Sequence, residues 1–276
     1  FPVLDEVGVV RDGLQLAWDF TTASRASVTD DILRTRALVL EALESSPPTV
    51  EILGYQDEDE GQAWRTISGI VTGPSVLESA EPGAALLRDE QGRVKLGEPV
   101  SFPFLAQVPR SVAQSDQPGR VLQFGHGFFG KRTEGIGGSV RSIANATESI
   151  SFSIDWWGMI SEDIGMMCAG FSQHLDTSLS VTDRIPQAMA NWLILTHAIE
   201  GPMKDLEAFQ RPDSGALLYD DTELNFLGIS MGAIFGGIYG ALNPSIDRVI
   251  LHVGGIAFTQ MMFRSGPFGN LLFMLD

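Results

Sequence analysis

The spacing of hydrophobic positions changes near residue 113. Before that point, short apolar runs predict strands at 49–53, 64–71 and 100–105, with one helix that begins near Thr29. After it, apolar strands at 119–124, 150–154, 224–227 and 246–253 alternate with helices at 139–146, 183–200 and 231–242. Strands that alternate with helices are typical of a parallel sheet. We therefore expect a β-rich N-terminal extension over 1–113 and an α/β domain over 114–276.

Proline and cysteine refine this picture. Pro103 has no backbone N–H to donate to a ladder, so the strand at 100–105 is expected at the edge of a sheet. Cys168 is the single cysteine of the chain, which excludes an internal disulfide and a cysteine-based zinc site. It lies in an apolar run and is interpreted as a buried thiol.

Charge narrows the range of partners. The 276 residues carry 35 acidic against 18 basic side chains, a net charge of −17, which would repel a nucleic acid. No apolar run is long enough to span a bilayer, so no transmembrane segment is expected. The favoured interpretation of the excess of acidic residues is that they make the protein soluble. No signal peptide is recognisable, and a secreted or cell-envelope location is favoured over the cytoplasm.

The candidate chemistry lies where a short strand turns into a helix. The strand at 224–227 runs into Gly228-Ile-Ser-Met-Gly232, and the apolar helix follows at once. This is the G-x-S-x-G pattern in the strand–turn–helix setting that places a serine hydroxyl above a sheet. Gly228 and Gly232 let neighbouring backbone approach, and Ser230 becomes the candidate nucleophile. The alternative is a glycine-rich turn with a buried serine.

A second motif, Gly125-His-Gly-Phe-Phe-Gly130, follows the strand at 119–124. Together the two motifs resemble the α/β-hydrolase superfamily, particularly bacterial esterases and lipases, over about residues 115 to 260. The resemblance implies a mostly parallel sheet with flanking helices. It also implies an oxyanion hole made by the backbone N–H groups of Phe128 and Met231. Gly125, His126 and Gly127 would form the oxyanion loop, with His126 as a structural member and not the catalytic base.

The rest of the expected triad is harder to place. In the family that the chain resembles, the order is Ser, then acid, then His. Only His252 follows Ser230, and it lies within an apolar strand. We expect the acid and the histidine to come from beyond this chain, through a second polypeptide segment that completes the fold. A less favoured account is an unusual triad that uses His174 or His252.

The motifs point to a class of reaction and leave the substrate open. We expect a serine hydrolase that cleaves carboxylic esters through an acyl-enzyme on Ser230, with no cofactor and no metal. An acyltransferase, amidase or polyester depolymerase would share this chemistry, and a non-catalytic binding protein on the same scaffold is a separate alternative. The substrate is expected to be a small-molecule or lipid-like ester. Its possible pocket is formed by Phe129, Trp156, Trp157 and Met159.

Overall fold

A computed structural model describes residues 4, 6–10, 12, 14, 15, 21–173, 180–266 and 269. Its internal contacts divide the chain into two units, residues 1–30 and residues 31–276. All of the strands lie in the second unit. None of the helices in the described ranges is both long and apolar enough to cross a membrane.

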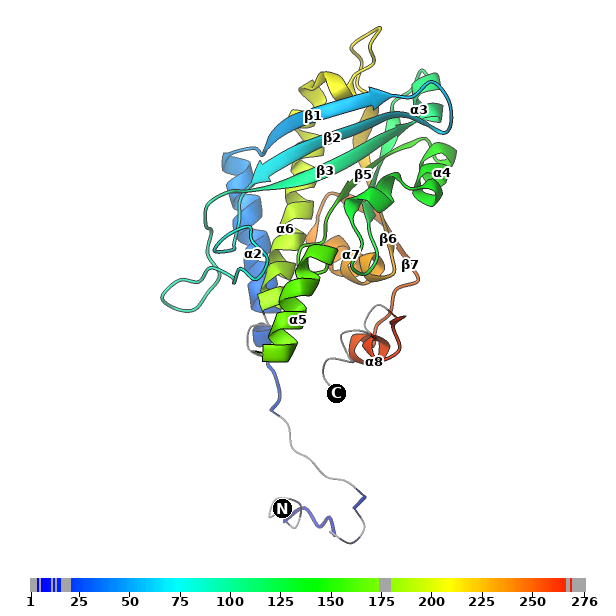
Figure 1. The fold of residues 1–276 in the computed structure, drawn as a ribbon. Coiled ribbons are helices and arrows are strands. Elements are labelled where there is room, and N and C mark those ends of the chain that lie inside the picture. Colours follow the sequence, from blue (N-terminus) through cyan, green and yellow to red (C-terminus); the bar gives the residue numbers. More distant parts are fainter. Residues whose placement is uncertain are drawn as a thin grey trace. The chain divides into compact units, whose positions relative to one another are not determined.

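The second unit is built on one seven-stranded sheet in the order β1-β2-β3-β5-β4-β6-β7 (Figure 1). The strands are β1 (Thr49–Asp57), β2 (Ala63–Gly73), β3 (Val100–Pro109), β4 (Gly119–Gly125), β5 (Ser149–Ile154), β6 (Tyr219–Ile229) and β7 (Ile246–His252). Strands β5, β4, β6 and β7 are parallel to one another. Strands β1, β2 and β3 pair antiparallel, and β3 also pairs antiparallel with β5. The parallel half therefore brings four strand C-termini to one edge of the sheet.

Helices connect and cover the strands. The α-helices are α2 (Arg25–Ser45), α3 (Arg110–Gln114), α4 (Gly138–Ala146), α5 (Ile164–Gln173), α6 (Ser180–Glu200), α7 (Met231–Leu242) and α8 (Phe258–Met262). Short 3-10 helices are η2 (Arg132–Ile136), η3 (Ser161–Asp163), η5 (Pro202–Asp205) and η6 (Glu207–Phe209). Helix α6 keeps its predicted position although Pro186 lies inside its first two turns.

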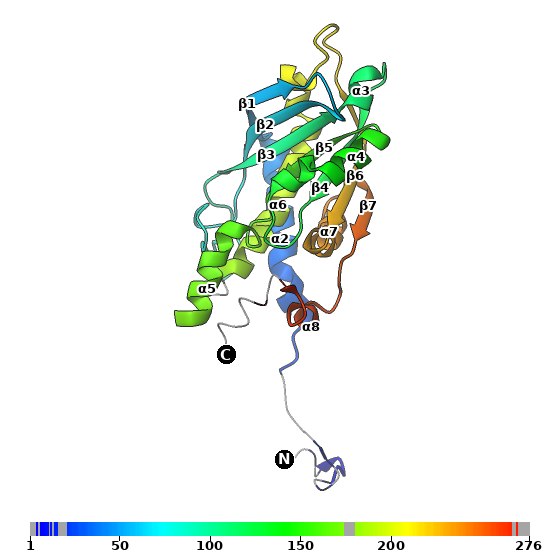
Figure 2. The same ribbon diagram turned by 45° about the vertical axis from the view of Figure 1, so that its right-hand side comes forward.

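The two faces of the sheet carry separate cores because side chains alternate along each strand. On β6, Phe226 packs in the large cluster that includes residues of α2, α6 and α7. Its neighbour Leu227 packs in a second cluster with Val140 of α4. Figures 1 and 2 show α4 and α6 separated by the sheet. The predicted α/β architecture with flanking helices is thus confirmed.

The predicted boundary near residue 113 does not coincide with the division in the structure. Strands from both sides of that position belong to one sheet, because β3 pairs with β5. The prediction that the strand with Pro103 is an edge strand is wrong, since β3 lies between β2 and β5. Proline is tolerated there because pairing with β5 begins only at Phe104. The β-rich N-terminal part is thus an antiparallel extension of the sheet.

Candidate functional site

Ser230 lies on the turn between β6 and α7. It is the single residue between Ile229, the last of the strand, and Met231, the first of the helix. Its backbone has φ 55° and ψ −117°, a conformation that costs a non-glycine residue about 1–3 kcal/mol. Strain of this kind persists only where the surroundings enforce it and is concentrated at functional sites. The predicted sharp turn at the serine is therefore present, with an exposed side chain.

Glycines on either side make this turn possible. A Cβ atom on Gly228 would lie 2.0 Å from the carbonyl oxygen of Gly232, and one on Gly232 would lie 2.1 Å from the carbonyl oxygen of Gly125. Both positions therefore exclude a side chain, since neighbouring backbone occupies the space. The Ser230 N–H donates to the carbonyl oxygen of His252 at 3.0 Å, which ties the turn to β7.

The loop after β4 lies next to Ser230. An ideal Cβ on Gly127 would be 3.8 Å from the Cβ of Ser230, so the two backbones are neighbours. Phe129 has a positive φ of 52°, and the Gly130 N–H donates to the Gly127 oxygen at 3.1 Å, which folds the loop into a tight turn. The rings of Phe128 and Phe129 meet edge to face at 4.5 Å. The loop thus places backbone groups beside Ser230.

His126 anchors this loop from below. Its side chain is completely buried, and its Nε2 accepts the Trp156 N–H at 2.9 Å. The other ring nitrogen, Nδ1, lies 2.8 Å from the Gly127 oxygen and donates to it in the tautomer that the first bond requires. Burial lowers the pKa of His126, opposed by the bond to Gly127 and by the charges of Asp155 and Glu134. A buried, neutral ring with a hydrogen bond at each nitrogen agrees with a structural role.

Charged side chains fix the far end of the loop. Asp155, directly after β5, accepts the Arg132 backbone N–H at 2.7 Å and pairs with the Arg132 guanidinium at 2.5 Å. Closer to Ser230, Glu134 Oε2 accepts the Gly127 N–H at 3.1 Å. Sequence reasoning missed Glu134, because a carboxylate on a short 3-10 helix seven residues after the glycine carries no recognisable signal.

A small apolar cluster lies against the loop. Met167 of α5 and Val181 of α6 are buried, and the partly buried side chains of Phe128, Phe129, Cys168 and Met262 pack around them. Three helices, α5, α6 and α8, thus contribute apolar surface beside the two phenylalanines. Phe129, a predicted pocket residue, belongs to this cluster.

The other predicted pocket residues lie deeper. Trp156 is fully buried and packs its ring against Trp192, Phe226 and Phe235 at centroid distances of 4.9, 6.3 and 5.4 Å. Its side chain therefore belongs to the aromatic core and offers no surface to a ligand. Trp157 and Met159 are 7% and 6% exposed and join the same core.

A buried ion pair supports the loop that carries Trp157. Asp163 and Arg184 have 1% and 3% exposed side chains and approach to 3.2 Å between Oδ1 and Nε. Asp163 also accepts the Gly158 N–H at 2.7 Å, and the Arg184 guanidinium lies 4.7 Å from the Trp157 ring centre. Burial raises the pKa of Asp163 and lowers that of Arg184. This pair was not foreseen from the sequence.

The histidines in the described ranges do not complete a triad. No hydrogen bond between the Ser230 hydroxyl and a histidine ring is present there. His197 binds the Leu193 carbonyl oxygen of its own helix at 3.0 Å. The His252 side chain is exposed on β7, and His174 lies outside the described residues. The site therefore holds a strained serine and an anchored loop, without a partner base among these residues.

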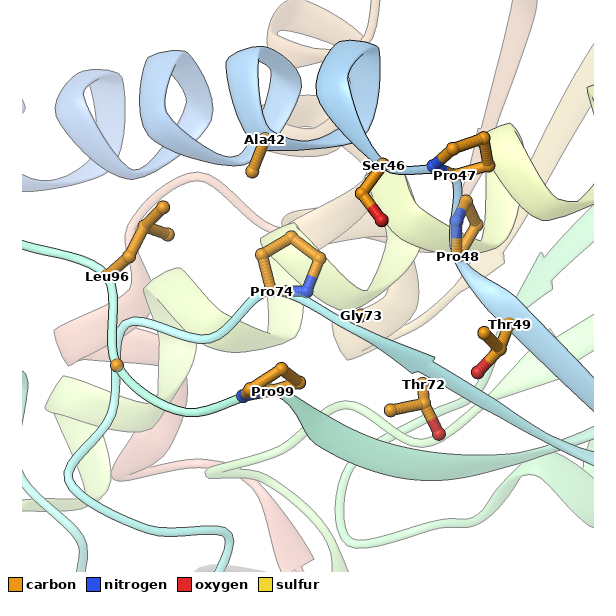
Figure 3. A pocket seen from close by; sticks show the side chains of 11 residues that line it. Ala42, Ser46, Pro47, Pro48, Thr49, Thr72, Gly73, Pro74, Leu96 and Pro99 are labelled. Atoms are coloured by element: carbon orange, nitrogen blue, oxygen red, sulfur yellow. The ribbon is translucent and has the colours of Figure 1, made fainter.

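A separate cavity of about 310 Å³ opens beside the end of α2 (Figure 3). It is lined by Ala42, Ser46, Pro47, Pro48, Thr49, Thr72, Gly73, Pro74, Leu96, Gly97 and Pro99. Figure 3 shows the rings of Pro74 and Pro99 facing the space below the helix. It contains no charged side chain and no residue of the serine turn or its neighbouring loop, so it is distinct from the candidate site.

Comparison with known proteins supports the fold. No protein-family model matches the sequence, and no curated protein matches it. Among solved structures, acetyl xylan esterase 1 from Thermoanaerobacterium sp. JW/SL YS485 is similar, with a TM-score of 0.50, 11% identity and coverage of 88% of this chain and 65% of that chain. The acetyl xylan esterase from Paenibacillus sp. R4 has a TM-score of 0.46 and 13% identity, with coverage of 89% of this chain and 67% of that chain. The rice cell wall degrading esterase LipA from Xanthomonas oryzae has a TM-score of 0.37 and 11% identity, with coverage of 77% of this chain and 51% of that chain.

The arrangement of strands, helices and the serine turn is that of the α/β-hydrolase fold. The likeness to the first of these structures, at 11% identity, concerns the fold alone. The chain spans 65% of the length of that acetyl xylan esterase.

Proposed function

We propose that this chain carries the nucleophile half of a serine hydrolase that cleaves carboxylic esters, with Ser230 as the nucleophile. The observation that carries the proposal is the strained backbone of Ser230, which stands alone between a parallel strand and a helix beside the Gly127 loop. In this arrangement the hydroxyl attacks the ester carbonyl and an acyl-enzyme forms, which water then hydrolyses. The backbone N–H groups of Phe128 and Met231 would stabilise the oxyanion, a contribution of about 3–4 kcal/mol per donor.

The ester that fits best has an apolar acyl or aryl part. The cluster of Phe128, Phe129, Met167, Cys168, Val181 and Met262 lies beside the proposed oxyanion loop and offers no charge. An apolar wall of this kind excludes water and favours uncharged groups. The structure of acetyl xylan esterase 1 from Thermoanaerobacterium is similar to this chain. Acetylated xylan should therefore be tested as a substrate, together with aryl acetates and longer aryl esters.

The base and acid would come from a further polypeptide segment that pairs with β7. This strand is at the edge of the sheet, and its Val249, Ile250 and Leu251 are 37%, 56% and 48% exposed. Next to it, Ile234, Ile238 and Ile256 help line an apolar cavity of about 450 Å³. Exposed apolar surface on an edge strand is a typical docking surface. A segment that covers it would reach the C-terminal edge of the sheet, where Ser230 lies.

A fluorophosphonate tests the nucleophile directly, because it forms a covalent bond only with an activated serine. The protein expressed from its complete gene is treated and its intact mass measured. We expect one adduct, mapped to Ser230, lost in Ser230→Ala and retained in the control Ser245→Ala. Ester hydrolysis should disappear with the adduct. Undiminished hydrolysis by Ser230→Ala would contradict the proposal.

A non-catalytic binding protein is the second candidate. It is favoured by the absence, in the described ranges, of a histidine ring hydrogen-bonded to the Ser230 hydroxyl. If the complete protein forms no adduct and hydrolyses no ester of the panel, while it still binds one of them reversibly, this second function replaces the first.

A further inference from the structure

Glu134 occupies an unusual place beside the proposed oxyanion loop. It is an exposed residue of the 3-10 helix η2, yet its Oε2 accepts the Gly127 N–H at 3.1 Å. A Cβ on Gly130 would lie 1.9 Å from its Oε1, so the carboxylate rests against the bare backbone of the loop. One side chain thus contacts both ends of the Gly127–Gly130 turn.

The same carboxylate is close to the nucleophile. The ideal Cβ position on Gly127 is 3.8 Å from Glu134 Oε2 and 3.8 Å from the Ser230 Cβ. Glu134 and Ser230 therefore both lie next to Gly127. Any change in how the carboxylate holds this glycine moves backbone that lies directly against the serine.

Neighbouring cations do not account for the position of Glu134. Lys131 pairs with Glu162 at 2.5 Å, and Arg132 pairs with Asp155 at 2.5 Å. Glu134 forms no ion pair with any residue in the described ranges. A negative charge here would also oppose an oxyanion at Ser230. What remains is its function as a hydrogen-bond acceptor for the Gly127 amide.

We propose that Glu134 is a positioning residue that fixes the oxyanion loop through the Gly127 amide. This inference rests on the proposed function, since it concerns the same site. The bond fixes the His126–Gly127 peptide, which directly precedes the Gly127–Phe128 peptide, and so it restricts where the Phe128 N–H points relative to Ser230. Geometry matters here because a displacement of about 1 Å can cost about 100-fold in rate. The acceptor is required and the charge is not.

Three variants of the complete protein separate these properties. Glu134→Ala removes acceptor and charge, Glu134→Gln keeps an acceptor oxygen without the charge, and Thr133→Ala changes an exposed neighbour on the same helix. With an aryl acetate, we expect Glu134→Ala to lower kcat about 10- to 100-fold with KM within about twofold. Glu134→Gln should keep kcat at or above the wild-type value, because it removes the opposing charge. Thr133→Ala should match wild type.

The result can be read even if a variant is unstable. Thermal unfolding is followed for all three variants, and kinetics are compared below the lowest midpoint. If Glu134→Gln is as slow as Glu134→Ala, or if Glu134→Ala raises KM and leaves kcat unchanged, the positioning role is overturned. If Ser230→Ala is inactive and Glu134→Ala is fully active, the inference about Glu134 fails and the proposed function stands. If Ser230→Ala is fully active, the proposed function fails first.

Discussion

Gly232 and Gly125 meet backbone to backbone, since a Cβ on Gly232 would lie 2.1 Å from the Gly125 carbonyl oxygen and 2.7 Å from that of His126. Helix α7 therefore touches the end of β4 with no side chain between them. This contact sets the distance between the serine turn and the loop that follows β4. Two segments about a hundred residues apart are held together at the point where the proposed chemistry takes place.

Gly232→Ala should break this contact. The added methyl group meets backbone and not a flexible side chain, so α7 must shift, at a cost of about 1–3 kcal/mol or more. Gly237→Ala on the same helix is the matched control, because its Cβ would find Leu251 at an ordinary 3.6 Å. That change should stabilise the fold by about 0.5–1 kcal/mol. Urea unfolding measures both, and equal midpoints for the two variants would refute the argument.

The local parts of this fold could be predicted from the sequence. Apolar runs and turn residues predict strands β4, β5 and β6 and helix α7. The G-x-S-x-G pattern predicts the strained turn at Ser230. The position of β3 could not be predicted in this way. Pro103 predicted an edge position for this strand. Whether a strand lies inside a sheet depends on partners that are distant in the sequence, here β2 and β5.

Side-chain surroundings at the site were less predictable still. Trp156 follows a strand at the ligand-binding edge, which favoured a pocket, yet Trp192 of α6 and Phe235 of α7 enclose it. That burial depends on how three elements pack. Glu134 and the Asp163–Arg184 pair form contacts that no local pattern encodes. The sharp turn at Ser230 could be predicted because its backbone geometry is local, whereas the contacts that support this turn are tertiary.

His126 should make the stability of the protein depend on pH. Its pKa is lowered by burial, so between the folded pKa and the unfolded value of about 6.5 the unfolded chain binds the extra proton. The contribution of the neutral ring is fully present above about pH 6.5 and is lost as pH falls below it. We expect the stability advantage of wild type over His126→Asn to shrink from pH 8 to pH 5. An advantage that grows as the pH falls would show that the ring is charged in the folded state.

The Asp163–Arg184 pair should be sensitive to the loss of one partner. Arg184→Met keeps bulk beside Trp157 but leaves a buried carboxylate, at a cost of about 3–5 kcal/mol. Since burial already raises the pKa of Asp163, the folded variant would bind a proton that the unfolded chain releases, and its deficit should grow as pH rises from 5 to 8.

The double variant Asp163→Asn/Arg184→Met provides the control for this prediction. Its amide oxygen can still accept the Gly158 N–H, and no unpaired charge remains. We expect it to be more stable than Arg184→Met alone, with little dependence on pH over the same range. Additive losses in a double-mutant cycle from urea unfolding would show that the two side chains do not interact.

The edge strand β7 gives the sharpest test of the proposed additional segment. Ile250 on β7 and Leu53 on β1 are 56% and 59% exposed and lie on the two outer strands of the same sheet. If a segment covers β7 in the complete protein, Ile250→Lys buries an unpaired charge and should cost about 3 kcal/mol or more, measured by urea unfolding. Leu53→Lys should change stability by about 0.5 kcal/mol at most, because that position stays in water. In the isolated chain of residues 1–276, both changes should be equally mild, since Ile250 is then solvent-exposed. Mild effects of both changes in the complete protein would mean that β7 remains uncovered there, and the source of the base would have to be sought elsewhere.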